Sequence, residues 1–147
     1  MTPRTLKQLR PKDTLPKLPS KLIEISLSEL RKIESDPRYQ VNMNYWHVPL
    51  DGGECHVCLA GAVMAGKLRI PVDQEIVLCQ FSSKLSDKLV AIDYLRQGYV
   101  GLAFELLGLE KPSKMRELYQ ITSYHDNRIS FLKDMRRLQN RLVAAGF

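Results

Sequence analysis

The most reactive part of the sequence is residues 45–62, which hold two of the three Cys and two of the three His. Cys55 and Cys58 are separated by two residues, a spacing that allows two thiolates to bind one zinc ion. Together with His47 and His125 they would supply the four sulfur and nitrogen ligands of a closed zinc site. A second closely spaced pair of ligands is missing, so we favour no metal and expect no cofactor.

Cys58 has a second possible role as a nucleophile. It precedes an apolar run, and a thiol at the start of a helix is activated by backbone amides and by the helix dipole. The stretch 55–60, Cys-His-Val-Cys-Leu-Ala, resembles the Cys-x-x-Cys-aromatic-Ala stretch around the nucleophile of papain-family cysteine proteases. Leu59 stands where that family has an aromatic residue, and the Gln of the family's oxyanion hole has no counterpart upstream.

The resemblance implies a hydrolase or transferase with a defined set of residues. Cys58 would attack the substrate, His125 would act as the base, and Asp126 or Asn127 would orient the imidazole. The chain is shorter than a papain-type catalytic domain, so an enzyme is not the interpretation that we favour from the sequence.

The same residues also have a structural interpretation, which we favour. Free cysteine is among the most frequently buried residue types, so Cys58 would be a small hydrophobic side chain in the core. Trp46 would be a core anchor. Residues 125–127, His-Asp-Asn, would cap the last helix, a position for which Asp and Asn are well suited.

Positive charge is concentrated at the start of the chain. Residues 1–21 hold six basic residues and one acidic residue, a net charge of +5, whereas the rest hold sixteen basic and fifteen acidic residues, a net charge of +1. Pro lacks an amide hydrogen and restricts the residue before it, so the four Pro of this segment favour extended chain. We therefore predict a basic arm over residues 1–21, followed by one globular domain over residues 22–147. The basic side chains of the arm that we expect to bind are Arg4, Lys7, Arg10 and Lys12.

A second basic surface is predicted on the last helix, residues 129–145. Its cationic side chains are Lys133, Arg136, Arg137 and Arg141. Together with the arm and a surface formed by Tyr45, Trp46 and His47, this helix face favours a non-enzymatic binding or regulatory protein. Its partner would be an acidic macromolecule, either nucleic acid or an acidic protein surface.

Length and composition set the fold class. A chain of 147 residues with 44% hydrophobic residues is expected to form one domain. No apolar run approaches the roughly 20 residues that cross a bilayer, and the first residues lack the apolar centre of a signal peptide, so we expect a cytoplasmic protein without a membrane partner. The sequence does not indicate an oligomeric state.

Periodicity predicts an α+β fold dominated by helices. We expect three or four main helices, packed around a helix at 58–68 that is rich in small residues, and a minor sheet from residues 39–48 and 75–81. The predicted helices, with Ser26 as the N-cap of the first, cover residues 27–35, 58–68, 83–106, 112–119 and 129–145.

The general organisation, a basic arm joined to a small helical body with a Cys-Leu-Ala-Gly-Ala motif at 58–62, resembles small proteins of bacteriophages and prophages. The resemblance concerns this organisation and one short motif, and it implies no activity.

Overall fold

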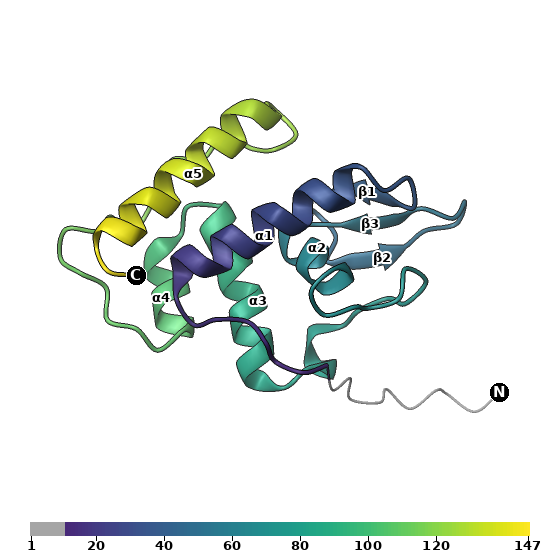
Figure 1. The fold of residues 1–147 in the computed structure, drawn as a ribbon, viewed down its shortest axis with the longest axis horizontal. Helices are drawn as coiled ribbons and strands as arrows, with labels where there is room; N and C mark the ends of the chain where they lie inside the picture. The colour runs from purple at the N-terminus through teal and green to yellow at the C-terminus, as the bar shows by residue number, and fades with distance from the viewer. Residues whose placement is uncertain (1–10) are drawn as a thin grey trace.

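The structure, a computed structural model, describes residues 11–147, and a long helix lies at its centre (Figure 1). This helix, α1 (Pro19–Glu34), contacts three other helices and one strand. Pro19 occupies the first helical turn, where the missing amide hydrogen costs nothing and the fixed φ favours a helix. The predicted arm over residues 1–21 is therefore wrong at residues 19–21, which are helical. Ser26 is not an N-cap, because it is buried within α1 and its hydroxyl donates to the Ile23 carbonyl at 3.0 Å.

Residues 11–18 lead into α1 and are partly fixed to the body. Leu15 is buried, and its carbonyl accepts a hydrogen bond of 2.8 Å from the Lys88 ammonium group. Lys88 also forms an ion pair with Asp13 at 3.0 Å. Arg4, Lys7 and Arg10 lie outside the described residues, so the prediction for these three side chains stays a prediction.

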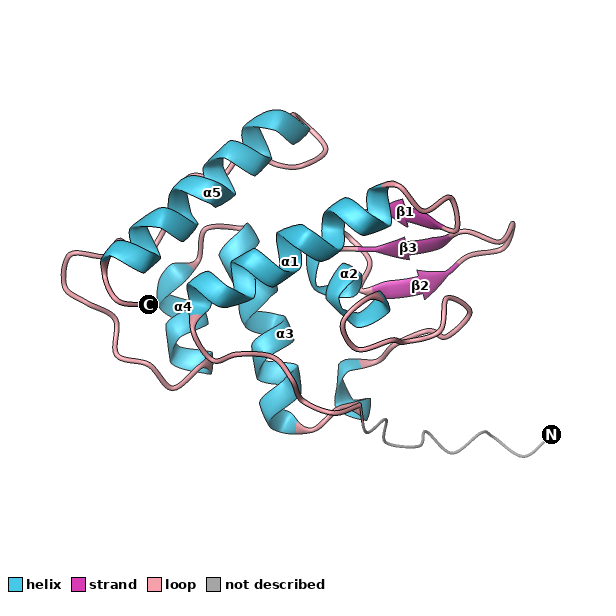
Figure 2. Ribbon diagram, viewed as in Figure 1, coloured by secondary structure: helices cyan, strands magenta, loops and turns pink. Residues whose placement is uncertain are grey.

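A small sheet packs against α1 and α2 (Figure 2). Its strands are β1 (Tyr39–Val41), β2 (His47–Pro49) and β3 (Cys55–Val57), in the order β1-β3-β2. β3 is parallel to β1 and antiparallel to β2. The single predicted strand over 39–48 is thus two strands with a turn between them.

The third strand differs from the predicted one. Residues 55–57 were not assigned to the sheet from the sequence, yet they form β3, because side chains alternate between the core and the surface there. Residues 75–81 were predicted to be a strand, yet they hold a 3₁₀ turn, η1 (Leu78–Gln80). The Gln80 side chain stabilises this turn by accepting a hydrogen bond from the Val77 amide at 2.9 Å.

The remaining helices are α2 (Leu59–Ala65), α3 (Ser83–Arg96), α4 (Val100–Leu106) and α5 (Arg128–Ala144). The predicted helix over 83–106 is divided at Gly98, whose φ of +86° is a conformation that glycine adopts without strain. The short helix predicted over 112–119 is absent, and the chain there forms a turn followed by extended backbone. The last helix is confirmed, and the Asn127 side chain caps it by accepting a hydrogen bond from the Ser130 amide at 3.0 Å.

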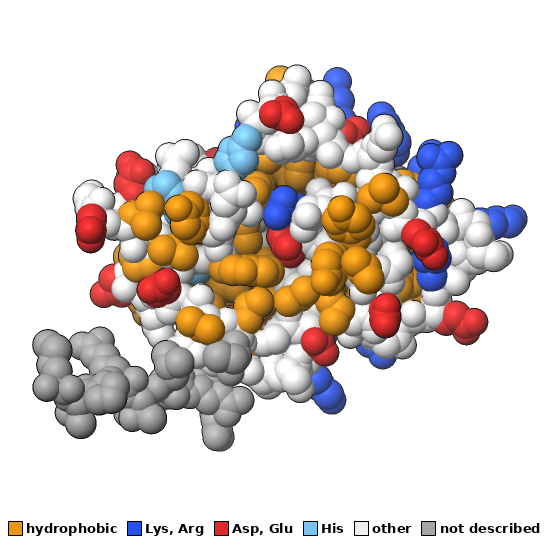
Figure 3. Space-filling view, turned by 180° about the vertical axis from the view of Figure 1, so that it is seen from behind, with side chains coloured by type: hydrophobic (Ala, Val, Ile, Leu, Met, Phe, Trp, Pro, Cys, Tyr) orange, Lys and Arg blue, Asp and Glu red, His pale blue; other side chains and the backbone are white. Residues whose placement is uncertain are grey.

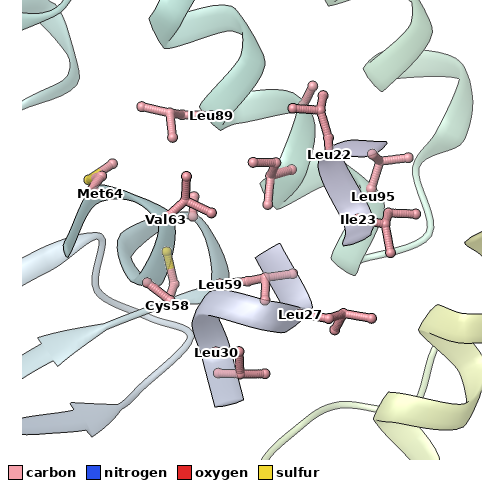
Figure 4. Packing of buried hydrophobic residues seen from close by; sticks show 14 of the residues in the cluster. Leu22, Ile23, Leu27, Leu30, Cys58, Leu59, Val63, Met64, Leu89 and Leu95 are labelled. Atoms are coloured by element: carbon pink, nitrogen blue, oxygen red, sulfur yellow. The ribbon is translucent and has the colours of Figure 1, made fainter. Parts of the chain in front are cut away.

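The core lies between α1, α2 and α3, as Figure 4 shows. Leu22 and Leu30 from α1, Leu59 from α2 and Leu89 from α3 are fully buried. The prediction of a helix-dominated α+β fold is confirmed, with five α-helices and a three-stranded sheet in residues 11–147.

Helix α5 lies alongside α1 and is fastened to it at both ends. At one end the Arg128 guanidinium and the Tyr124 hydroxyl both donate to the Glu34 carboxylate, the latter at 2.7 Å. At the other end the Ser20 hydroxyl donates to the Phe147 carbonyl at 2.9 Å. These contacts hold both ends of α5 against α1.

The Glu34 contact predicts a pH-dependent contribution to stability. Its hydrogen bond with Arg128 lowers the pKa of Glu34, so the carboxylate stabilises the folded state above its ordinary pKa of 4.5 and loses this effect as the pH falls. We expect Glu34→Gln to lower the free energy of unfolding by about 1 kcal/mol at neutral pH. Denaturant titrations at several pH values should show this difference shrinking below pH 4.5.

A matched control is Glu24→Gln. Glu24 forms an exposed ion pair with Lys21, for which we expect almost no change in stability. If the stability loss of Glu34→Gln were the same at neutral and at acidic pH, the ionised Glu34 carboxylate would not be the source of the stabilisation.

Candidate anion-binding groove

The predicted thiol nucleophile is not assembled. Cys58 is only 2% exposed, and burial raises the pKa of its thiol to about 11. Its sulfur accepts a hydrogen bond from the Gly61 amide at 3.4 Å, as an N-cap of α2, and its thiol donates to the Trp46 carbonyl at 3.9 Å. The predicted base, His125, is exposed and accepts a hydrogen bond from the Met43 amide at 3.0 Å. Asp126 lies beside it in the exposed turn before α5.

The predicted zinc ligands are also dispersed. The Cys55 sulfur lies 3.6 Å from Nδ1 of His47, and both side chains are fully buried. Nδ1 of His47 donates to the Gln74 carbonyl at 2.7 Å, and burial lowers the pKa of this imidazole. Cys58 and His125 have the separate partners given above. Among the side chains that the structure describes, no three His, Cys, Asp or Glu are grouped so that they could hold a metal ion.

The predicted surface of residues 45–47 is wrong at His47. This side chain faces the interior because it lies on the buried face of β2. Tyr45 is exposed, and its ring packs edge-on against His56 with centroids 5.6 Å apart. Trp46 is half-buried and packs against the core, as the structural interpretation predicted.

The basic side chains of α5 do not form one surface. An α-helix turns about 100° per residue, so Arg137 and Arg141 share one flank while Arg136 lies on another. Arg136 donates to Gln139 on that other flank at 3.3 Å. Lys133 is exposed one turn before Arg137. Only Arg137 and Arg141 face a neighbouring segment of chain.

That neighbouring segment is residues 116–122, and a groove lies between it and α5. The groove has a volume of about 450 Å³. Its wall is formed by Arg116, Leu118, Tyr119, Gln120, Ile121, Asp134, Arg137, Leu138 and Arg141. Three guanidinium groups and one carboxylate therefore line the groove, which carries a net charge of +2.

The carboxylate in the groove is already engaged. Asp134 accepts a hydrogen bond of 2.8 Å from the Thr122 amide, which lowers the pKa of its carboxyl group, and it forms an ion pair with Arg137 at 3.4 Å. The Arg141 guanidinium lies over the Tyr119 ring at 5.9 Å, a cation–π arrangement that leaves its donors available. Among the described residues the Arg116 guanidinium forms no ion pair. The groove is therefore suited to a group with negative charge.

Backbone contacts hold residues 116–122, the wall of the groove opposite α5, in position. The Tyr119 amide donates to the Gly98 carbonyl at 2.8 Å, and the Gly101 amide donates to the Glu117 carbonyl at 3.3 Å. The Arg116 amide is 3.4 Å from the Tyr119 hydroxyl. The break between α3 and α4 therefore fixes the segment that carries Arg116.

Arg116 and Tyr119 were missed by sequence reasoning because a helix was predicted over 112–119. The β-branched Ile121 and Thr122 favour extended chain just beyond that helix, but they lie outside it and give no direct signal against it. The convergence of Arg116 with Arg137 and Arg141 has no signal in local sequence.

Comparison of the chain with known protein families, with curated proteins and with solved structures found no match. No helix within residues 11–147 is long and apolar enough to span a membrane.

Proposed function

We propose that this chain is a binding protein that holds an anionic group of a macromolecular partner in the groove between α5 and residues 116–122. The observation that carries the proposal is the convergence of Arg116, Arg137 and Arg141 from two separate segments on one groove. Arg presents a planar fork of donors that fits carboxylate and phosphate groups, and such charge-assisted hydrogen bonds are stronger than neutral ones.

A binding role is supported over chemistry at Cys55 or Cys58 by the state of these two thiols. Burial raises the pKa of Cys55 and of Cys58 to about 11, so neither is a thiolate near neutral pH. The groove that we assign lies on other elements and contains no cysteine.

The basic arm would act at a different place. Lys12, the first described basic residue of the arm, lines a second basic surface with Lys32, Lys67 and Arg69. Part of this surface is formed by α1 (Figure 1), and it shares no lining residue with the groove on α5. We propose that the arm contributes general attraction to an acidic partner, whereas the groove on α5 provides the fixed contacts.

The proposal predicts a loss of affinity when the groove loses charge. We expect Arg116→Gln with Arg137→Gln to weaken binding of acidic probes at least about tenfold, since each charge-assisted hydrogen bond contributes about 1.5–3 kcal/mol. Fluorescence anisotropy would measure this with labelled duplex DNA, single-stranded RNA and polyglutamate at about 50 and about 200 mM salt. The acidic probe that binds should bind more weakly at the higher salt concentration.

The matched control is Arg31→Gln with Arg136→Gln, which removes the same charge from exposed positions outside the groove. We expect this control to change affinity less than about threefold. Equal losses in the two double variants, or no salt-dependent binding of any probe by the full chain, would overturn the proposal.

A further inference from the structure

A second groove lies beside the first, on the surface of α4. Its volume is about 570 Å³. It is lined by Tyr99, Gly101, Leu102, Phe104, Glu105, Leu109, Lys111, Glu117 and Leu118. Leu102 is 45% exposed and Leu118 is 55% exposed, values that are high for large apolar side chains. The groove is therefore an apolar surface with no covering element among the described residues.

Leu118 belongs to both grooves. It lines the basic groove against α5 and the apolar groove against α4, so the two grooves share this wall. Its backbone forms an antiparallel bridge with Tyr99, which fixes its position. Figure 3 shows hydrophobic side chains spread over this face of the molecule and Lys and Arg side chains along the edge where α5 lies.

The charges of the two grooves differ in sign. The apolar groove holds Glu105 and a Lys111–Glu117 ion pair of 3.7 Å, which gives it a net charge of −1. The basic groove has a net charge of +2. A molecule that lies across Leu118 therefore meets an apolar, weakly negative surface on one side and guanidinium groups on the other.

We infer that the two grooves together bind an acidic amphipathic peptide segment of another protein. Its apolar side chains pack against Leu102 and Leu118 on the α4 side, and its carboxylates, placed at one end of the segment, reach Arg116, Arg137 and Arg141. This inference rests on the proposed function and adds the chemical class of the partner.

Charge and polarity favour a peptide over a nucleic acid. A phosphate backbone that continued from the basic groove across Leu118 would approach Glu105 and Glu117, and this repulsion would oppose binding. Leu102 and Leu118 offer no donors to phosphates, whereas leucine surfaces of this kind bind apolar side chains of peptides. A helical peptide of about 14 residues spans about 21 Å.

The test uses the full chain and three labelled peptides of about 14 residues. The first has Leu and Phe at helical spacing in its first half and several Glu in its last turn. In the second, Ser replaces the apolar residues, and in the third, Lys replaces the Glu. We expect the first peptide to bind at least about tenfold more tightly than either of the others, because both kinds of contact are needed.

Variants of the chain then locate the peptide. Leu102→Ser with Leu118→Ser should reduce affinity for the first peptide at least about tenfold and leave the second unchanged. The matched control is Ile129→Ser with Val143→Ser, which alters two exposed apolar side chains of α5 that line neither groove. We expect this control to change affinity less than about twofold. Far-ultraviolet circular dichroism and thermal unfolding would confirm that both double variants are folded.

The outcomes separate this inference from the proposed function. Equal binding of the first two peptides, or an effect of the Leu double variant no larger than that of its control, overturns the inference while the proposed function stands. Arg-dependent binding of duplex DNA or RNA, with no preference for the first peptide, also overturns the inference alone. If no probe depends on Arg116 and Arg137, both proposals fail.

Discussion

Replacement of Gly98 by Ala is expected to lower the free energy of unfolding by about 2–5 kcal/mol, the combined cost of backbone strain and a steric clash. The φ of Gly98 is +86°, a conformation that side chains with a Cβ rarely adopt. A Cβ at this position would lie 1.8 Å from the carbonyl oxygen of Tyr119. Because this oxygen belongs to the backbone, the clash is relieved only if the segment carrying Arg116 and Leu118 moves.

Gly108→Ala is the matched control for this prediction. Gly108 also has a positive φ, +66°, but a Cβ at this position would have the flexible Lys17 ammonium nitrogen as its nearest neighbour, at 4.0 Å. Backbone strain alone should cost about 1 kcal/mol there. Urea denaturation of both variants measures the difference. Equal losses of stability at the two positions would contradict the role assigned to the contact between Gly98 and Tyr119.

The Gly98 variant also tests how the groove is built. Because the Tyr119 amide donates to the Gly98 carbonyl, displacement of this segment shifts Arg116 relative to Arg137 and Arg141. A folded Gly98→Ala protein should therefore bind the acidic probes less tightly than the Gly108→Ala protein. This result would connect a backbone feature of the α3–α4 break to the proposed function.

The last helix was predictable from the sequence, whereas the first half of α1 (Pro19–Glu34) was not. The bounds of α5 differ from the predicted 129–145 by one residue at each end, because a buried stripe repeats along it and Asn127 supplies a cap. The turn at residues 51–53 follows from two adjacent glycines, both of which have positive φ. In these cases the pattern that forms the element lies within one segment of sequence.

Short or tertiary features were not predictable. Each strand has three residues, too few for an alternating pattern to be recognised, so β3 was not predicted. The helical pattern continues through Gly98, and the backbone divides α3 from α4 there through the positive φ of Gly98 and the non-helical ψ of +70° at Tyr99. The groove depends on this break, because it directs residues 116–122 back along α5.

The cluster of Cys and His misled sequence reasoning for a related reason. Cys55, His56 and Cys58 are close in sequence, but alternation along β3 directs Cys55 inward and leaves His56 half-exposed. Cys58 follows the strand and turns into the N-terminus of α2. These side chains are therefore close in the sequence but lie in three different environments in the structure. A shared site would need them to converge.

Both described thiols, Cys55 and Cys58, are expected to react with iodoacetamide at least about 100-fold more slowly than free cysteine at neutral pH. Burial raises the pKa of each to about 11. The thiolate fraction at pH 7 is then about 10⁻⁴, compared with about 3% for an ordinary thiol. The greater basicity of these thiolates recovers about tenfold in rate, but a reagent also needs a local opening of the core to reach them.

Peptide mapping by mass spectrometry after timed alkylation gives the rate at each cysteine separately, and the same reaction in denaturant supplies the control rate. In denaturant both thiols should react at the rate of free cysteine, because unfolding removes the burial that raises each pKa. Alkylation of Cys58 in the folded protein at the rate of free cysteine would restore the thiol-nucleophile hypothesis. Protection of both thiols instead supports the structural interpretation, in which Cys55 and Cys58 fill the core.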